Sequence, residues 1–128
     1  MIAFFPGKFQ PPHLGHVLTI MDLYDKYDKV IVAITDDAPR VSSSTERKSI
    51  LERVFRHLGK VEVVLIPGVL TQYKTTTDLP HFDVCLSGNE DVIAKIKELG
   101  MKAKKVPRSD GIGYSGTEIR NLITTKRI

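Results

Sequence analysis

With 128 residues the chain has the length of one domain, and a domain of this size buries enough surface to fold without disulfide bonds. Its hydrophobic share of 41% and charged share of 27% exclude a disordered or fibrous protein. The net charge of +4 suits a polyanionic small ligand as well as a nucleic acid, but the basic residues are scattered among acids without interleaved aromatic residues. We therefore expect a single domain over residues 1–128 that has no nucleic-acid partner.

The cysteine content and the hydropathy pattern favour a cytoplasmic protein. Cys85 is the single cysteine, so no internal disulfide can form, and its apolar surroundings in the sequence favour a buried packing role. No segment approaches the roughly 18 consecutive apolar residues that a membrane helix needs. Residues 1–5 lead directly into a motif instead of a signal peptide, so we expect no membrane partner.

Apolar runs alternate with helically spaced apolar residues along the chain, a pattern typical of a parallel sheet covered by helices. Five strands are predicted, at residues 2–5, 30–35, 61–66, 82–87 and 103–106. Four helices are predicted. The first covers residues 14–24, the second starts at Ser43 and has its apolar spacing over 50–58, the third covers 90–99, and the fourth follows Ser115. Residues 68–79 are expected to form a loop or a short irregular helix beside the site. The predicted fold class is α/β: a single Rossmann-like domain with a five-stranded parallel sheet and helices on both faces.

Polar and glycine residues gather in the segments that follow four of these strands. These segments are residues 6–12, 36–44, 88–89 and 107–114. In a sheet of this kind, ligands bind outside the carboxyl ends of the strands, where the strand order reverses. We therefore expect a binding site at that edge.

The most specific pattern is GKFQPPHLGH at residues 7–16, which joins the first predicted strand to the first predicted helix. His13 and His16 are three residues apart, so they share one face near the positive end of that helix. Gly15 leaves room for a ligand between them, and Lys8 adds a positive charge. Imidazoles beside free helical N–H groups can bind phosphate oxygens, so the string predicts a phosphate site.

Two other interpretations of the histidine pair stay open. The pair could be two partly exposed histidines at the start of a helix, without a ligand. It could also bind zinc, but zinc usually requires three protein ligands, and the other candidates, Cys85, His57 and His81, have no ligand spacing with the pair.

The string HLGH at residues 13–16 resembles the H-x-G-H signature of a nucleotidyltransferase superfamily. The wider string at 7–16 is similar to the form found in archaeal-type nicotinamide mononucleotide adenylyltransferases. The SGTEIR string at 115–120 resembles the start of that family's last helix, and SGN at 87–89 resembles its string after the fourth strand. These resemblances span nearly the whole chain.

The resemblance implies transfer of a nucleoside monophosphate, with AMP favoured, from a nucleoside triphosphate to a small phosphorylated acceptor such as nicotinamide mononucleotide. It implies that four side chains stabilise the reacting phosphates: Lys8, His13, His16 and Arg120. Nucleotide contacts would come from Gly7, Phe9, Gln10, Gly15, Gly88, Asn89, Ser115 and Thr117. Mg²⁺ is expected as a cofactor that the triphosphate carries. Phosphoryl-type transfer needs positioning and charge neutralisation more than a covalent nucleophile, which agrees with these roles.

Contacts to the acceptor are expected from Asp36, Arg47, Tyr73 and Arg108. Asp36 could bind acceptor hydroxyls or metal, or could simply form a turn. Arg47 could bind a phosphate, or could be a surface arginine paired with Glu46 or Ser43. Tyr73 could provide the aromatic residue that the family stacks on nicotinamide. Asn89, at a strand end, could bind base or ribose or could cap a helix.

Three alternatives remain beside the adenylyltransferase. The short length and the VPRSDGI string at 106–112, with Arg108, resemble glycerol-3-phosphate cytidylyltransferases, which use CTP. A nucleotide-binding module without turnover is a second alternative, and a basic nucleic-acid adaptor is a third. A homodimer is possible, but no residue specifies its contact.

Overall fold

The computed structural model describes residues 1–9, 14–36 and 44–106, and the predicted last helix lies outside them. Five strands are present: β1 (Ile2–Gly7), β2 (Lys29–Asp36), β3 (Val61–Pro67), β4 (Val84–Ser87) and β5 (Ala103–Lys105). Three helices connect them: α1 (Leu14–Lys26), α2 (Ser44–Val54) and α3 (Glu90–Glu98). All five predicted strands and the three predicted helices within these ranges are therefore confirmed, with boundaries that differ by at most four residues.

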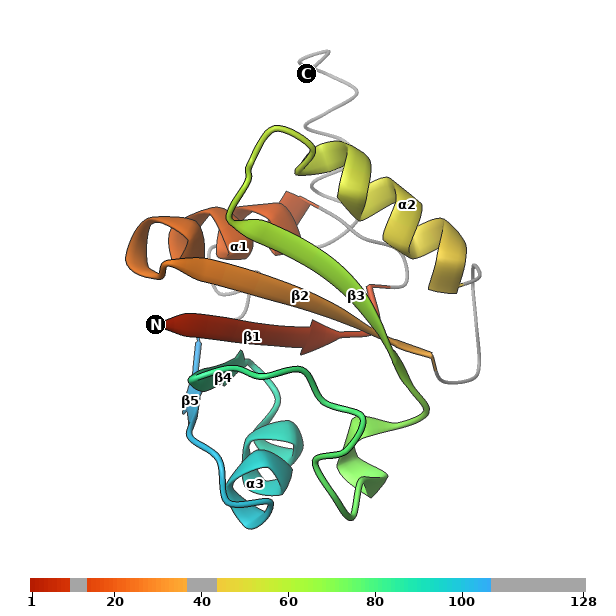
Figure 1. Ribbon diagram of the computed structural model, residues 1–128, viewed down its shortest axis with the longest axis vertical. Helices are drawn as coiled ribbons and strands as arrows, with labels where there is room; N and C mark the ends of the chain where they lie inside the picture. Colours follow the sequence, from red (N-terminus) through yellow and green to blue (C-terminus); the bar gives the residue numbers. More distant parts are fainter. Residues whose placement is uncertain (10–13, 37–43, 107–128) are drawn as a thin grey trace.

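The five strands form one parallel sheet in the order β3-β2-β1-β4-β5. From β1 the chain moves outward in one direction through β2 and β3, and then returns to the other side of β1 with β4 and β5. The strand order therefore reverses between β1 and β4. This sheet, with α1 and α2 on one face and α3 on the other, confirms the predicted α/β Rossmann-like fold (Figure 1).

The side chains of the central strands alternate between two apolar cores because successive residues of a strand point to opposite faces. The core on the α1 and α2 face contains Ala3, Phe5, Phe9, Ile20, Leu23, Val30, Val32, Ile34, Leu51, Phe55, Val84 and Leu86. The core on the α3 face contains Phe4, Ile31, Ala33, Ile66, Leu70, Phe82, Cys85, Ile96 and Ala103. Both faces of β1 and β2 are thus buried, which explains their almost continuously apolar sequences.

The predicted strand at 82–87 begins two residues late, at Val84. Phe82 instead packs its ring flat against Phe4, with the ring centroids 4.5 Å apart and the planes 8° from parallel. The carboxylate of Asp83 accepts a hydrogen bond of 2.6 Å from the backbone N–H of Ile2. Together with the 2.9 Å hydrogen bond from the backbone N–H of Asp83 to the carbonyl of Ile2, these contacts fix the chain at the entrance of β4.

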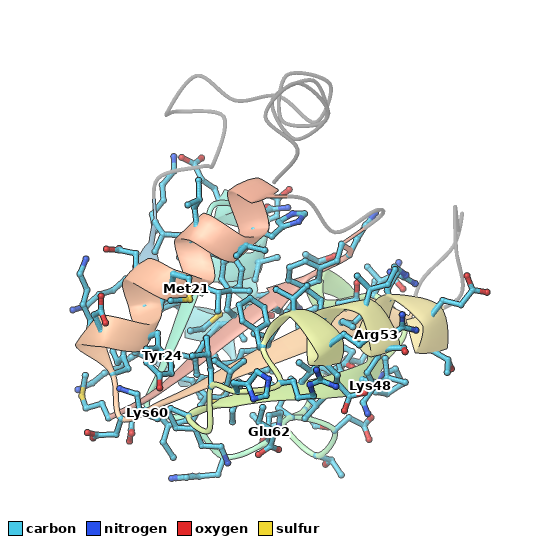
Figure 2. The ribbon with its side chains drawn as sticks, turned by 90° about the horizontal axis from the view of Figure 1, so that it is seen from above. Met21, Tyr24, Lys48, Arg53, Lys60 and Glu62 are labelled. Carbon is cyan, nitrogen blue, oxygen red and sulfur yellow. The ribbon has the colours of Figure 1, made fainter. Side chains whose placement is uncertain are left out.

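Polar side chains satisfy two of the helix ends. The Oδ1 atom of Asn89 accepts hydrogen bonds from the N–H groups of Asp91 and Val92 at the start of α3. At the end of α1, the ammonium of Lys60 donates to the carbonyls of Tyr24 (2.8 Å) and Tyr27 (3.1 Å) and lies 4.3 Å from the centroid of the Tyr24 ring. Figure 2 shows Lys60 and Tyr24 side by side at that end of the helix.

The segment at 68–79 contains a short 3₁₀ helix, Leu70–Gln72, followed by turns, as expected. Leu70 is buried in the core on the α3 face. The hydroxyl of Tyr73 donates a hydrogen bond to the carbonyl of Pro67, which closes the segment back onto the end of β3. Within the described residues, none of the helices is both long and apolar enough to cross a membrane.

Arg47 is fully buried, with 0% of its surface exposed, although it lies in a polar segment of the sequence. Arg47 lies in the first turn of α2. Its Nη1 atom donates a hydrogen bond to the backbone carbonyl of Lys8, just after β1, and lies 3.5 Å from the backbone carbonyl oxygen of Thr35 in β2. One guanidinium therefore joins the carboxyl ends of the two central strands. The surface-arginine interpretation was wrong because the short distance from α2 to these carbonyls directs the side chain inward.

We predict that Arg47→Met lowers the free energy of unfolding by about 1.5–3 kcal/mol, because hydrogen bonds from a charged donor to buried carbonyls contribute on this scale. Urea denaturation followed by circular dichroism measures the loss. The matched control is Arg53→Met on the same helix. Arg53 is exposed, and its one hydrogen bond among the described contacts runs from Nη2 to the Oγ atom of Ser49, at 3.4 Å. A change within about 0.5 kcal/mol is expected there, and equal losses in both variants would contradict the role of Arg47.

Candidate functional site

A cavity of about 310 Å³ opens at the carboxyl edge of the sheet, where the strand order reverses between β1 and β4. Its described lining residues come from the ends of three strands, from the 3₁₀ segment and from the start of α3: Pro6, Gly7, Lys8, Thr35, Val69, Leu70, Thr71, Ser87, Asn89, Asp91 and Val92. This is the position that parallel-sheet topology assigns to ligands. The expected site location is therefore supported by a cavity of suitable size for a small ligand.

The lining combines apolar side chains with a small set of polar groups. Among the described lining residues, Lys8 supplies a positive charge, Asp91 a negative charge, and Thr35, Thr71 and Ser87 supply hydroxyls. Such a mixture suits a ligand that carries phosphate and hydroxyl groups beside a less polar portion. The cavity is thus chemically compatible with a phosphorylated acceptor.

Thr35 and Ser87 are site residues that the sequence analysis did not select. The Thr35 hydroxyl points to the carbonyl of Gly7 at 3.4 Å, and the Ser87 hydroxyl accepts a 3.0 Å hydrogen bond from the N–H of Asn89. Both side chains are buried at strand ends. A hydroxyl at or next to the last position of an apolar strand, directly before a glycine or an acid, is the signal that would have identified them.

The backbone at the end of β1 is held firmly. The Lys8 carbonyl accepts the hydrogen bond from Arg47, while the exposed Lys8 side chain lines the cavity. Arg47 is not among the lining residues, because its guanidinium is directed at two carbonyls. The predicted contact between Arg47 and the acceptor stays a prediction, and the structure adds a second role: the guanidinium holds the backbone that carries Lys8.

The structure places the Phe9 ring in the core, and its predicted nucleotide contact stays a prediction. Its ring is 3% exposed, belongs to the core on the α1 and α2 face, and does not line the cavity. It lies edge-to-face against the imidazole of His16, with the ring centroids 4.7 Å apart. His16 is half-buried near the start of α1, beside the buried Gly15, so the motif is brought together through an aromatic contact.

The remaining predicted site residues with a described position are Gly88, Asn89 and Tyr73. Gly88 and Asn89 follow β4 as expected, and Asn89 lines the cavity. The Asn89 oxygen caps α3, which is the alternative that the sequence left open, and the cap uses only its Oδ1 atom. Tyr73 does not line the cavity: its ring packs on the core of the α3 face and its hydroxyl bonds Pro67. The stacking role expected of Tyr73 therefore stays a prediction.

The other predicted site residues lie outside the described residues: Gln10, His13, Arg108, Ser115, Thr117 and Arg120. Asp36 ends β2, next to Thr35, but its side chain is not described. The predicted meeting of the histidine pair with Arg120 is thus untested.

Burial decides the chemistry of two side chains near the site. It raises the pKa of the Cys85 thiol to about 12, so this residue is protonated at neutral pH and does not act as a nucleophile. Burial, followed by the charge of Asp78, raises the pKa of Tyr73. Across residues 1–9, 14–36 and 44–106, no three His, Cys, Asp or Glu side chains form a group that could hold a metal ion.

The family model described as cytidylyltransferase-like matches residues 4–122. Nicotinamide-nucleotide adenylyltransferase 1 from Sulfolobus acidocaldarius is 32% identical over 96% of this chain and 78% of its own length. The enzyme of that name from Methanosarcina barkeri is also 32% identical, over 92% of this chain and 74% of its own length.

Solved structures show the same fold. A NadR protein in complex with NR has a TM-score of 0.69 at 18% identity, and it aligns with 97% of this chain. A bifunctional NMN adenylyltransferase/ADP ribose pyrophosphatase from Francisella tularensis, complexed with AMP and a Mn ion, has a TM-score of 0.64 at 20% identity over 97% of this chain. The chain spans about two fifths of the length of these two neighbours.

The family match covers nearly all of the chain. It agrees with the sheet topology, with the motif at the end of β1, and with the cavity at the switch point, which is the place where the strand order reverses between β1 and β4. The resemblance found in the sequence is therefore confirmed. The chain belongs to the cytidylyltransferase-like family of nucleotidyltransferases.

Proposed function

We propose that the protein is an adenylyltransferase that transfers AMP from ATP to nicotinamide mononucleotide and releases pyrophosphate. The observation that carries the proposal is the cavity at the switch point, bordered by Lys8 from the motif at the end of β1 and by Ser87 and Asn89 from the SGN string. Curated relatives at about 30% identity over most of this chain bear the name nicotinamide-nucleotide adenylyltransferase.

In the proposed reaction, an oxygen of the acceptor phosphate attacks the α-phosphorus of ATP. A new P–O bond forms, the bond from the α-phosphorus to its bridging oxygen breaks, and pyrophosphate leaves with the electron pair. The acceptor phosphate is largely deprotonated at neutral pH, with a second pKa of about 6, so no strong general base is required. The protein's contribution is to place the two phosphates in line and to neutralise charge.

The described residues suit this task. Lys8 would draw a phosphate to the mouth of the cavity, and His16 would donate a hydrogen bond to the α-phosphate as negative charge builds up. The hydroxyls of Thr35, Thr71 and Ser87 would bind ribose or phosphate oxygens of the acceptor. His13 and Arg120, with Ser115 and Thr117, are proposed to hold the rest of the triphosphate. Mg²⁺, bound to the triphosphate, would neutralise further charge.

Further expectations are kept as part of this proposal. Residues 1–128 are proposed to form one catalytic domain, and the protein is proposed to act in the cytoplasm and to associate as a homodimer. Gln10, Asp36 and Arg108 are proposed to contact the substrates, with Arg108 facing nucleotide or acceptor phosphate.

We expect His16→Ala to lower kcat about 100-fold, since one preorganised donor to a charged transition state contributes about 3 kcal/mol. The control is His57→Ala, because His57 is exposed in the turn between α2 and β3 and far along the chain from the motif. Steady-state pyrophosphate release measures kcat, and circular dichroism verifies that both variants fold. A kcat for His16→Ala equal to that of the control would remove His16 from the mechanism.

The substrates are tested by crossing ATP and CTP with nicotinamide mononucleotide, glycerol 3-phosphate and phosphopantetheine, each in the presence of Mg²⁺. The combination of ATP and nicotinamide mononucleotide is expected to give the highest kcat/KM, at least about tenfold above the others, because a site that pairs the polar groups of one substrate rejects others by such factors. Preference for CTP with glycerol 3-phosphate would support a cytidylyltransferase instead. If no combination releases pyrophosphate, the result would support a binding module without turnover.

A further inference from the structure

The backbone of Phe9 is in an unusual conformation. Its φ of 52° places it in the left-handed region, and among the described residues it is the one non-glycine residue with a positive φ. A bulky side chain disfavours this region because its Cβ atom approaches the following carbonyl oxygen, whereas glycine adopts it freely. The sequence nevertheless has phenylalanine here, so the ring must contribute something that outweighs the strain.

The Phe9 ring is confined on three sides. Its edge meets the imidazole of His16 at a centroid distance of 4.7 Å and an angle of 69°, and it meets the Phe5 ring at 6.0 Å and 65°. On the side of Gly7, a Cβ atom would lie 3.0 Å from the Cε2 atom of the Phe9 ring. Glycine at position 7 thus lets the ring fit closely against the end of β1, and the ring has little freedom to move.

The peptide that precedes Phe9 is fixed as well. The Lys8 carbonyl accepts the hydrogen bond from the buried Arg47, so the backbone is clamped one residue before the ring. His16 is half-buried and lies near the start of α1. In the contact between the two rings, Phe9 is thus a closely confined partner against which the imidazole of His16 packs.

We propose that Phe9 is a positioning residue whose ring holds the His16 imidazole in the orientation that nucleotidyl transfer needs. This inference rests on the proposed function of His16. Edge-to-face contact fixes the plane of the imidazole, and the plane determines where its N–H groups point. Because a hydrogen-bond donor stabilises a transition state only when it is aimed at the developing charge, a freely rotating imidazole would lose much of its effect.

The test compares Phe9→Leu with the control Phe55→Leu. Phe55 belongs to the same core cluster and is similarly buried, at 4% exposure against 3% for Phe9, but it comes from the end of α2 and no ring contact to His16 is recorded for it. Leucine keeps each site filled with an apolar side chain, so both variants are expected to fold with similar losses of stability. Circular dichroism and urea denaturation establish this before any kinetic comparison.

Two readouts separate positioning from a general loss of stability. Phe9→Leu is expected to lower kcat about tenfold while KM for ATP changes by less than about threefold, and Phe55→Leu is expected to leave kcat within about twofold of the wild type. In two-dimensional NMR spectra of the same proteins, the ring-proton resonances of His16 are expected to shift in Phe9→Leu, where the ring current is removed, and to stay in place in Phe55→Leu.

The outcomes are distinguishable from failure of the proposed function. If the wild type releases no pyrophosphate with any substrate pair, the adenylyltransferase proposal falls, whatever the spectra show. If the wild type is active and Phe9→Leu matches Phe55→Leu in kcat, the positioning role is overturned while the function stands. Unchanged His16 resonances in Phe9→Leu would overturn it as well, because the contact between the two rings would then be missing in solution.

Discussion

The structure depends on how the end of β1 is fixed. The guanidinium of Arg47 donates to the carbonyl of Lys8 and approaches that of Thr35, and it does so from inside the protein with no exposed surface. A buried charge is unfavourable unless its hydrogen bonds are satisfied by well-placed acceptors. The ends of β1 and β2 must therefore stay in one arrangement, which fixes the backbone of Lys8 at the end of β1.

The strand order turns this local constraint into a site. Because the order reverses between β1 and β4, the segments after these strands separate and leave the cavity between them. Lys8 lines the cavity from one side, and Ser87 and Asn89 line it from the other. The cap that Asn89 forms on α3 holds the second side, as Arg47 holds the first. A preorganised cavity of this kind suits phosphoryl-type transfer, in which positioning supplies much of the catalysis.

Much of the fold could be predicted from the sequence because the sheet is buried on both faces. The central strands β1 and β2 are almost continuously apolar, and α1 has the helical spacing of a half-buried helix, so both were recognisable. The phosphate motif was recognisable because glycine, lysine and two histidines occur together between a strand and a helix. Local patterns of this kind need no knowledge of tertiary contacts.

The rest depends on contacts between residues far apart in the sequence. Arg47 lies among serine, threonine and glutamate, which indicates a surface, and only the packing of α2 shows that it is buried. Phe9 looks like a ligand contact because it lies within the motif, yet its left-handed backbone turns the ring into the core. The bond from the Tyr73 hydroxyl to the carbonyl of Pro67 joins residues that no local sequence pattern pairs.

The central claim is that the fixed end of β1 presents Lys8 and His16 to the reacting phosphates. A crystal structure with a non-hydrolysable ATP analogue, Mg²⁺ and nicotinamide mononucleotide tests it most directly. The account predicts the α-phosphate within hydrogen-bond distance of the His16 imidazole, and the acceptor phosphate at the mouth of the cavity beside Lys8. A triphosphate bound elsewhere, for example at the surface hollow lined by Lys29, Phe55 and Arg56, would contradict it.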